Sequence, residues 1–217
     1  MIFPHPFHAD DDGLLAYGGD LSPSTLLAAY SWGIFPWYSQ PPILWWFTHP
    51  RCILRPSKVK VSKSMRSYFN QKRFKTTTDT CFEQVINECS RVKRKNQETT
   101  WISEDMINAY IELHHIGHAH SIEVWEEDLL VGGLYGIAIG NIFFGESMFS
   151  TASNASKFGL ITLCRFLEEK EFLLIDCQQE TDHIMSLGAE IIPKEEFLHT
   201  LKKNMEISVD TSSWKWK

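Results

Sequence analysis

The sequence predicts an α+β protein in which helices pack on a mixed, mainly antiparallel sheet. Two observations support this fold class. Residues 120–149, HSIEVWEEDLLVGGLYGIAIGNIFFGESMF, alternate in polarity and are interrupted at Glu-Asp and at Gly-Asn, as expected of three consecutive antiparallel strands. Helical and strand patterns then follow one another to residue 203, so helices are available to cover the sheet.

The first well-marked element is a helix over residues 22–33. Ser22 is its expected N-cap, Pro23 occupies the first turn, and Gly33 follows its end. The next segment, residues 34–47, is rich in aromatic residues and contains three prolines, which exclude a regular helix or a central strand. We therefore expect an ordered aromatic loop or a short strand pair, with one or two tryptophans lining a cleft because buried indole N–H groups need partners.

The composition changes from aromatic to basic near residue 51, which predicts a small N-terminal domain, residues 1–57, and a larger domain, residues 58–217. Helices are predicted over residues 62–71, 80–92 and 103–117, the last with Ser103 as its cap and Gly117 as its stop. After the three strands, the patterns predict a helix over 154–170, a buried strand over 172–179, a short helix over 182–190, a strand over 190–193 and a closing helix over 194–203.

Charge is unevenly distributed along the chain, whose net charge is −6. Residues 51–95 contain 13 Lys and Arg against 3 Asp and Glu, whereas the remaining residues contain 8 against 24. A single run such as RVKRK is usually a solvated surface. Three basic runs within this block, however, predict a patch that binds a polyanion.

The expected location is the cytoplasm. No apolar run is long enough to span a membrane, and the N-terminus lacks the pattern of a secretory signal. The five cysteines include no C-x-x-C pair, which is typical of reduced thiols rather than of a disulfide framework or a zinc site.

A histidine cluster is the first candidate for chemistry. His114, His115, His118 and His120 lie within seven residues. Their spacing straddles a helix stop and a strand start, so the four rings are not expected to converge on one ion. We predict structural or capping roles for them and no metal site.

Glu146 and Asp176 are the stronger candidates. Glu146 lies in an apolar run, where a carboxylate must be paired, hydrated or functional. Both acids fall late in predicted strands, and Gln178, two residues after Asp176, should point to the same face. Two acids and an amide in one apolar cleft could bind an amine, move a proton or stabilise an oxyanion. Equally, each acid could be a buried group satisfied by backbone or by an Arg.

Known cofactor motifs are missing from the sequence. It contains no G-x-S-x-G, P-loop or dinucleotide fingerprint, so no cofactor is predicted.

Five motifs, GGDLSP, GIFPW, GHAHSIEVW, GESMFS and LIDCQ, carry a resemblance that extends from about Phe3 to Leu201. Over this range the chain resembles the bacterial leucyl/phenylalanyl-tRNA–protein transferases. The resemblance implies a small N-terminal domain followed by an acetyltransferase-like (GNAT) domain. It also implies transfer of Leu or Phe, and Met less readily, from aminoacyl-tRNA to the α-amino group of proteins with N-terminal Arg or Lys. In the N-end rule pathway such products are degraded.

The resemblance also implies roles for individual residues. Its reaction centre corresponds to Glu146, Asp176 and Gln178, and the contacts to the aminoacyl-adenosine end correspond to Trp37 and Trp101. Its side-chain pocket corresponds to Leu134, Phe143 and Ile175, with Met148 close by. Within the basic block we expect Lys93, Arg94 and Lys95 to bind the tRNA backbone. The sequence does not fix the oligomeric state, and we expect a monomer.

Two other functions remain open. The first is a coenzyme A-dependent N-acetyltransferase, suggested by the implied fold alone; STASNASKFG lacks the Gly-rich loop that holds the coenzyme A pyrophosphate in true acetyltransferases. The second is a non-catalytic RNA-binding module, for which basic runs and stacking aromatics suffice. That second function leaves Glu146 and Asp176 unexplained, because acids near a phosphate path weaken binding.

Overall fold

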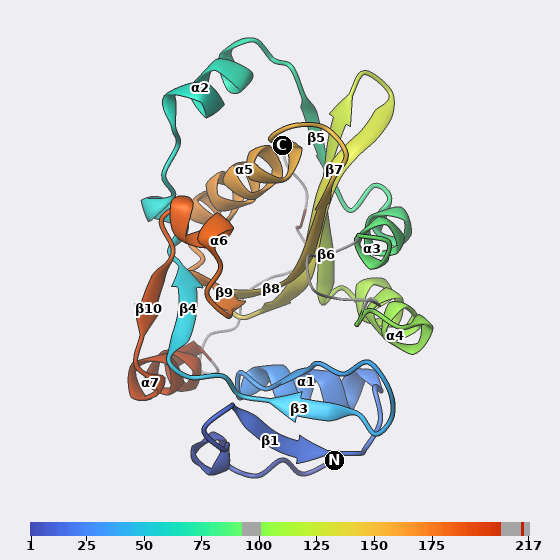
Figure 1. Ribbon diagram of the computed structural model, residues 1–217, viewed down its shortest axis with the longest axis vertical. Helices are drawn as coiled ribbons and strands as arrows, with labels where there is room; N and C mark the ends of the chain where they lie inside the picture. The colour runs from blue at the N-terminus through green and yellow to red at the C-terminus, as the bar shows by residue number, and fades with distance from the viewer. Residues whose placement is uncertain (93–100, 205–213, 215–217) are drawn as a thin grey trace.

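A seven-stranded sheet organises the larger part of the chain (Figure 1). The computed structural model describes residues 1–92, 101–204 and 214. The strands follow the order β10 (Glu190–Ile192), β4 (Arg51–Leu54), β9 (Leu174–Gln178), β8 (Ile142–Ser150), β7 (Leu129–Ile139), β6 (Ala119–Glu126) and β5 (Lys75–Thr78). β8 and β9 are parallel, and all other neighbours in this sheet are antiparallel. The predicted α+β class with a mixed, mainly antiparallel sheet is confirmed.

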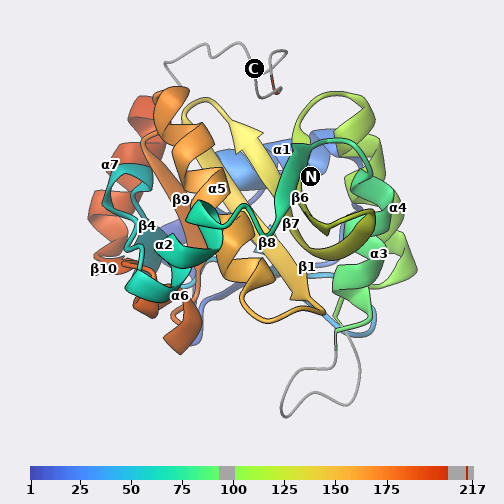
Figure 2. The same cartoon turned by 90° about the horizontal axis from the view of Figure 1, so that it is seen from above.

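Helices cover both faces of this sheet. They are α2 (Lys63–Asn70), α3 (Phe82–Ser90), α4 (Glu104–His115), α5 (Ala155–Glu169), α6 (Asp182–Ser186) and α7 (Lys194–Asn204). α5 crosses one face, and α3 and α4 lie against the other (Figures 1 and 2). Side chains along β7 alternate between the two faces of the sheet. Leu134 belongs to the apolar cluster on the α5 side, and Tyr135 belongs to the cluster on the opposite side.

The N-terminal part forms a separate small sheet with one helix. The strand order is β1 (Leu14–Tyr17), β3 (Leu44–Trp46) and β2 (Phe35–Pro36). The segment over residues 34–47 is therefore a strand pair, one of its two predicted forms. Helix α1 (Pro23–Ser31) is capped as predicted, because the Ser22 side chain accepts a hydrogen bond from the Thr25 N–H. Short 3₁₀ turns η1 (Pro6–His8) and η2 (Pro56–Lys58) flank this region.

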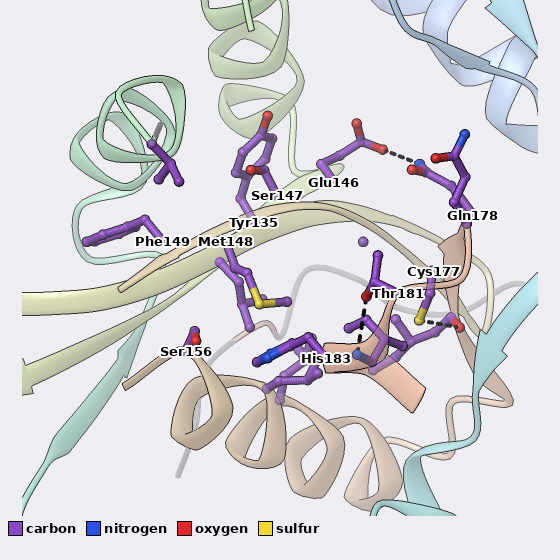
Figure 3. A pocket seen from close by; sticks show the side chains of 18 of the residues that line it. Tyr135, Glu146, Ser147, Met148, Phe149, Ser156, Cys177, Gln178, Thr181 and His183 are labelled. Atoms are coloured by element: carbon purple, nitrogen blue, oxygen red, sulfur yellow. Dashed lines mark hydrogen bonds between the residues drawn. The ribbon is translucent and has the colours of Figure 1, made fainter. Parts of the chain in front are cut away.

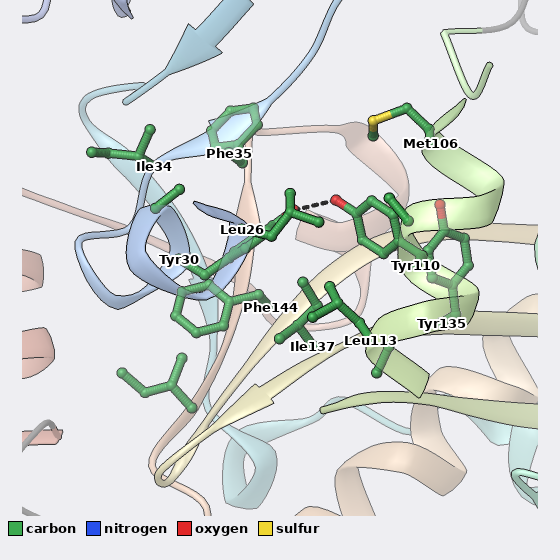
Figure 4. Packing of buried hydrophobic residues seen from close by; sticks show 14 of the residues in the cluster. Leu26, Tyr30, Ile34, Phe35, Met106, Tyr110, Leu113, Tyr135, Ile137 and Phe144 are labelled. Atoms are coloured by element: carbon green, nitrogen blue, oxygen red, sulfur yellow. Dashed lines mark hydrogen bonds between the residues drawn. The ribbon is translucent and has the colours of Figure 1, made fainter. Parts of the chain in front are cut away.

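Helix α1 lies between the two sheets and brings its apolar face to the larger one. Figure 4 shows Leu26 and Tyr30 of α1 facing Tyr110 and Leu113 of α4. Tyr30 and Tyr110 have no exposed surface, and their hydroxyls contact each other. This contact matters for the site, because both hydroxyls reach it.

Three strands were not predicted, namely β1, β4 and β5. The most consequential is β4, whose four residues, RCIL, are all buried. It lies within the basic block, where a buried strand is not expected, and the structure buries Arg51 by pairing its charge with Asp176. The division of the chain after residue 57 stays a prediction, and β4, although it precedes that residue, pairs within the larger sheet.

Among the residues that the structure describes, no helix is both long enough and apolar enough to cross a lipid bilayer.

Candidate functional site

A cavity opens where β8 and β9 stop pairing. The two strands pair at only three positions, ending at Phe144 and Asp176. Residues that follow on both strands line a cavity of about 670 Å³. Eight of the residues with predicted site roles line it, namely Trp37, Trp101, Leu134, Phe143, Glu146, Met148, Ile175 and Gln178. Residues from distant parts of the chain are therefore brought together at one gap in the sheet (Figure 3).

A β-bulge positions Glu146. Tyr135 pairs with Ser147 and Gly136 with Gly145, so Glu146 has no partner on β7. A bulge re-aims the side chain of its extra residue, and bulges are frequent beside active sites. The close approach of the strands also requires glycine at position 136, because a Cβ there would lie 2.2 Å from the Phe144 carbonyl oxygen. The sequence predicts Glu146 late in its strand, whereas the structure places it in the middle of β8.

The carboxylate of Glu146 accepts three hydrogen bonds from three different elements. The Tyr30 hydroxyl donates to Oε1 at 2.7 Å, the Tyr110 hydroxyl to Oε2 at 2.9 Å, and Gln178 Nε2 to Oε1 at 3.0 Å. Burial raises the pKa of Glu146 to about 7, although these three hydrogen bonds act to lower it. Burial, followed by the proximity of Glu146, raises the pKa of both tyrosines well above the ordinary value, so their hydroxyls remain donors.

Asp176 lies behind the cavity and does not line it. It is fully buried and forms an ion pair with Arg51, whose Nη2 is 2.6 Å from Oδ2. Its Oδ1 accepts a hydrogen bond from the backbone N–H of Gln178 at 2.9 Å. The chain turns at Gln178, where φ is +61°, and the Gln178 side chain reaches the cavity. The expected projection of both residues into one cleft is therefore wrong, because this turn breaks the alternation of the strand.

The two acids thus have different surroundings. Asp176 matches the alternative that the sequence left open, because it is a buried carboxylate balanced by an Arg. Glu146 is bonded to hydroxyls and an amide, and no cation is within ion-pair distance of it among the described residues. A carboxyl of this kind can exchange a proton near neutral pH.

The remainder of the cavity is largely apolar. Leu160 and Leu163 of α5 join the predicted Leu134, Phe143, Met148 and Ile175 in lining it. His183 of α6 lies apart from Glu146 in Figure 3. Burial lowers the pKa of His183. A ligand can place an apolar side chain of moderate size in this space while its polar end meets Glu146 and Gln178.

Sequence reasoning missed Tyr30, Tyr110 and Arg51. A signal for the tyrosines existed, because both occur on the apolar faces of predicted helices and a buried hydroxyl needs a partner. For Arg51 the signal was weaker, since a basic residue in a basic block is expected at the surface. The predicted residues Lys93, Arg94 and Lys95 lie outside the described residues.

Two histidines of the cluster, His114 and His120, have structural contacts. His114 Nδ1 is 2.8 Å from the Ala119 carbonyl oxygen, and its ring stacks on Phe82. His120 Nδ1 is 2.7 Å from Asp79 Oδ2. In the part of the chain that the structure describes, no group of three His, Cys, Asp or Glu residues could hold a metal ion.

Carboxyl, amide and apolar surface together suit one class of reaction. A carboxyl with a pKa near 7 can orient an amine and accept its proton at neutral pH. An amide beside it can polarise a carbonyl. The geometry therefore suits acyl transfer to an amine from a donor with an apolar side chain.

Comparison with known proteins identifies a family. Residues 53–202 match the family model described as leucyl/phenylalanyl-tRNA protein transferase, and residues 19–49 match the model for its N-terminal domain. A protein from Syntrophus aciditrophicus named leucyl/phenylalanyl-tRNA–protein transferase is 49% identical over 99% of this chain and 90% of its own length. A protein of the same name from Desulfatibacillum aliphaticivorans is 50% identical over 99% of this chain and 92% of its own.

Likeness to solved structures is weak. A GCN5-related N-acetyltransferase from Kribbella flavida is 10% identical, with a TM-score of 0.38 over 79% of this chain and 61% of its own.

Proposed function

The chain belongs to the leucyl/phenylalanyl-tRNA protein transferase family of aminoacyltransferase enzymes, and we propose that it transfers Leu or Phe, and Met less readily, from aminoacyl-tRNA to proteins. The acceptor is the α-amino group of a protein that begins with Arg or Lys. The amine attacks the ester carbonyl, an amide bond forms, the ester bond breaks, and the tRNA leaves with a free terminal hydroxyl. In the N-end rule pathway the product is marked for degradation, and the reaction takes place in the cytoplasm.

One observation carries this proposal. Glu146 and Gln178 are joined by a hydrogen bond at the wall of an apolar cavity, where an activated ester and an amine can meet. The ester is already reactive, so the main contribution of the enzyme is to hold the two groups together, which can lower the barrier by several kcal/mol.

The apolar part of the cavity supports the choice of donor. Leu134, Phe143 and Ile175 form its surface with Met148, and we assign the donor side chain to this region. Chains that are unbranched at Cβ fit such a slot, whereas Ile and Val clash at the β-carbon. Trp37 and Trp101, which line the same cavity, are suited to contact the aminoacyl-adenosine end by stacking.

Glu146 and Gln178 divide the chemistry between them. An α-amino group has a pKa near 8, so a useful neutral fraction exists at pH 7. Glu146, with a pKa of about 7, orients this amine and accepts its proton as the new bond forms. Gln178 polarises the carbonyl that is attacked. Asp176, paired with Arg51, holds the Gln178 backbone and takes no part in the proton transfer of this scheme.

The basic block supports binding of the tRNA backbone. Its described basic residues in and around α2 are exposed, and they are Lys58, Lys60, Lys63, Arg66, Lys72, Arg73 and Lys75. These side chains would neutralise phosphates without reading sequence, so affinity should fall as salt rises. The acidic remainder of the chain suits an acceptor with a basic N-terminal residue.

The test is a transfer assay with purified protein, Leu-tRNA and a peptide that begins with Arg. The proposal expects a mass gain of one leucine at the peptide N-terminus, absent with a peptide whose α-amino group is acetylated. A parallel reaction with labelled acetyl-coenzyme A tests the acetyltransferase alternative. Acetyl transfer without leucine transfer, or tRNA binding with no transfer at all, contradicts the proposal.

A further inference from the structure

Arg51 is buried at the centre of a set of contacts that lead to Glu146. Its side chain is 1% exposed. Nε donates to Asp176 Oδ1 at 2.8 Å, and Nη2 donates both to Asp176 Oδ2 at 2.6 Å and to the Gly33 carbonyl oxygen at 2.7 Å. One planar guanidinium therefore joins strand β9 to the turn that follows helix α1.

The first of these contacts leads to Glu146 through Gln178. Asp176 Oδ1, which accepts from Arg51, also accepts from the Gln178 backbone N–H at 2.9 Å. Gln178 in turn donates from Nε2 to Glu146 Oε1 at 3.0 Å. The position of the Gln178 amide thus depends on how Asp176 is held.

The second contact leads to the same oxygen through Tyr30. Gly33 closes the turn after α1, since its N–H donates to the Tyr30 carbonyl oxygen at 2.9 Å. The Tyr30 hydroxyl donates to Glu146 Oε1 at 2.7 Å. Both donors to Oε1 therefore belong to segments that Arg51 connects directly.

The surroundings of Arg51 are suited to a guanidinium and unsuited to an ammonium. Its central carbon lies 5.2 Å, 5.3 Å and 4.6 Å from the ring centroids of Phe35, Phe47 and Phe197. A guanidinium can stack on aromatic rings and donate in several fixed directions at once, whereas a lysine ammonium is a compact, strongly hydrated charge. Removing only one partner of such a buried pair leaves an uncompensated charge.

We propose that Arg51 is a positioning residue of the transfer reaction, which fixes the Tyr30 hydroxyl and the Gln178 amide relative to each other and so orients the Glu146 carboxylate. Arg51 does not line the cavity and does not touch substrate in this account. The inference rests on the proposed function for its effect on turnover. Its effect on Glu146 can be measured without any transfer.

The ionisation of Glu146 provides that measurement. The groups that face it are Tyr30 from α1, Tyr110 from α4, Gln178 from β9 and, at longer range, Asp176 behind the cavity. Tyr135 of β7 lines the same cavity. Hydrogen bonds from Tyr30 and Gln178 lower the pKa of Glu146, so their misalignment should raise it above the wild-type value of about 7.

The experiment uses Arg51→Lys in the full-length protein, with Arg55→Lys as the matched control. Arg55 follows the same strand and forms a partly exposed ion pair with Glu190, away from the cavity lining. Arg51→Lys should lower kcat on the order of 100-fold and leave the KM for aminoacyl-tRNA within about twofold, as expected when reacting groups are misplaced. NMR of carboxyl-labelled Glu146 should show its titration at higher pH, and Arg55→Lys should match the wild type in every readout.

A double variant separates positioning from folding. Arg51→Gln combined with Asp176→Asn removes both buried charges and keeps an oxygen at residue 176 that can accept from the Gln178 N–H. If Arg51 positions the site, this protein should unfold at a temperature near that of the wild type and still show low kcat.

Two results overturn the inference. One is a wild-type titration of Glu146 in Arg51→Lys, and the other is recovery of kcat in the double variant together with stability. Failure of the wild-type enzyme to transfer leucine is a separate outcome, which contradicts the proposed function and leaves the titration result to decide on Arg51.

Discussion

The side-chain amide of Gln178 donates to Glu146 Oε1 over 3.0 Å, across the gap at which strands β8 and β9 cease to pair. Both a bulge on β8 and a turn at the end of β9 are needed to make this contact. In regular strands the alternation of the backbone alone would set the direction of each side chain. The contact joins the acid to the amide at a cavity wall.

Activity should depend on the ionisation of Glu146. If the carboxylate accepts the proton of the amine, kcat/KM rises with pH through one inflection at about 7 from Glu146 and a second at about 8 from the acceptor amine. Glu146→Gln should lower kcat by about 100-fold and remove the inflection at about 7 while keeping that of the amine. Rates measured from pH 5 to 9 on the Arg-starting peptide provide the check, and an unchanged profile in Glu146→Gln contradicts the assigned role.

The free energy of unfolding should fall, whereas activity rises, as Glu146 loses its proton. The carboxyl has a pKa of 4.5 in its ordinary state and of about 7 in the folded protein, so the folded state binds the proton more tightly. Its contribution is therefore fully present below pH 4.5 and is lost as the pH rises through 7. Urea unfolding of wild type and Glu146→Gln across this window should show a steeper decline in the wild type. Parallel curves argue against a raised pKa.

Gln178→Ala should impair turnover more than binding. The substitution removes a donor to Glu146 and the amide that we assign to the reacting carbonyl, so we expect a loss of about 100-fold in kcat with little change in the KM for aminoacyl-tRNA. Gln179→Ala is the matched control, because Gln179 is the next residue along the cavity wall and makes no side-chain contact to Glu146. Equal effects of both substitutions contradict a specific role for Gln178.

Enlarging a side chain in the apolar region should alter the choice of donor. Leu134 is 3% exposed and lines the cavity, so Leu134→Phe should shorten the space and lower kcat/KM for Phe-tRNA more than for Leu-tRNA, by about 10-fold or more. Leu129→Phe on the same strand is the control, since Leu129 is 71% exposed and does not line the cavity. The measurement is competition between the two charged tRNAs. An unchanged ratio in Leu134→Phe places the donor side chain elsewhere.

Reversing charge on α2 should weaken tRNA binding. Lys63→Glu with Arg66→Glu should raise the KM for aminoacyl-tRNA and flatten its dependence on salt, because fewer phosphates are neutralised. Lys202→Glu with Lys203→Glu, on α7, is the control of equal charge change. The same assay applied to Lys93, Arg94 and Lys95 tests the basic run that the sequence singled out. If neither the reversal on α2 nor the reversal at Lys93, Arg94 and Lys95 changes the KM and its salt dependence, the basic block does not bind tRNA.

Trp214 should contribute strongly to stability. It is 6% exposed and packs between His120 and Phe166, with its ring stacked near Phe143 of the cavity lining. Trp214→Ala should lower the free energy of unfolding by about 3–5 kcal/mol. Trp32→Ala, at a position that is 44% exposed, should change it far less. Urea denaturation compares the two, and similar losses contradict the packing role of Trp214.

Local sequence patterns predicted most of the fold because they reflect periodicity and capping. The strands on either side of Gly140 and the caps at Ser22 and Ser103 follow from such patterns. The strand β4 did not, because its burial depends on a long-range pair between Arg51 and Asp176 that no local pattern contains. Trp214 was missed for the same reason, since it packs against residues far away in the chain.

The site was predicted unevenly for a related reason. Glu146 and Gln178 could be found, because a carboxylate among phenylalanines and an amide after a buried strand are unusual. Their contact depends on a bulge and a positive φ, which alternation cannot predict. The two tyrosine donors lie on separate helices and meet Glu146 only through tertiary packing.

A crystal structure with a non-hydrolysable phenylalanyl-adenosine amide would locate the aminoacyl group in the cavity. We expect the phenyl ring among Leu134, Phe143 and Ile175, with the carbonyl oxygen within hydrogen-bond distance of the Gln178 amide. Density for the aminoacyl group outside this cavity, with Glu146 and Gln178 still bonded only to each other and to the protein, would contradict it.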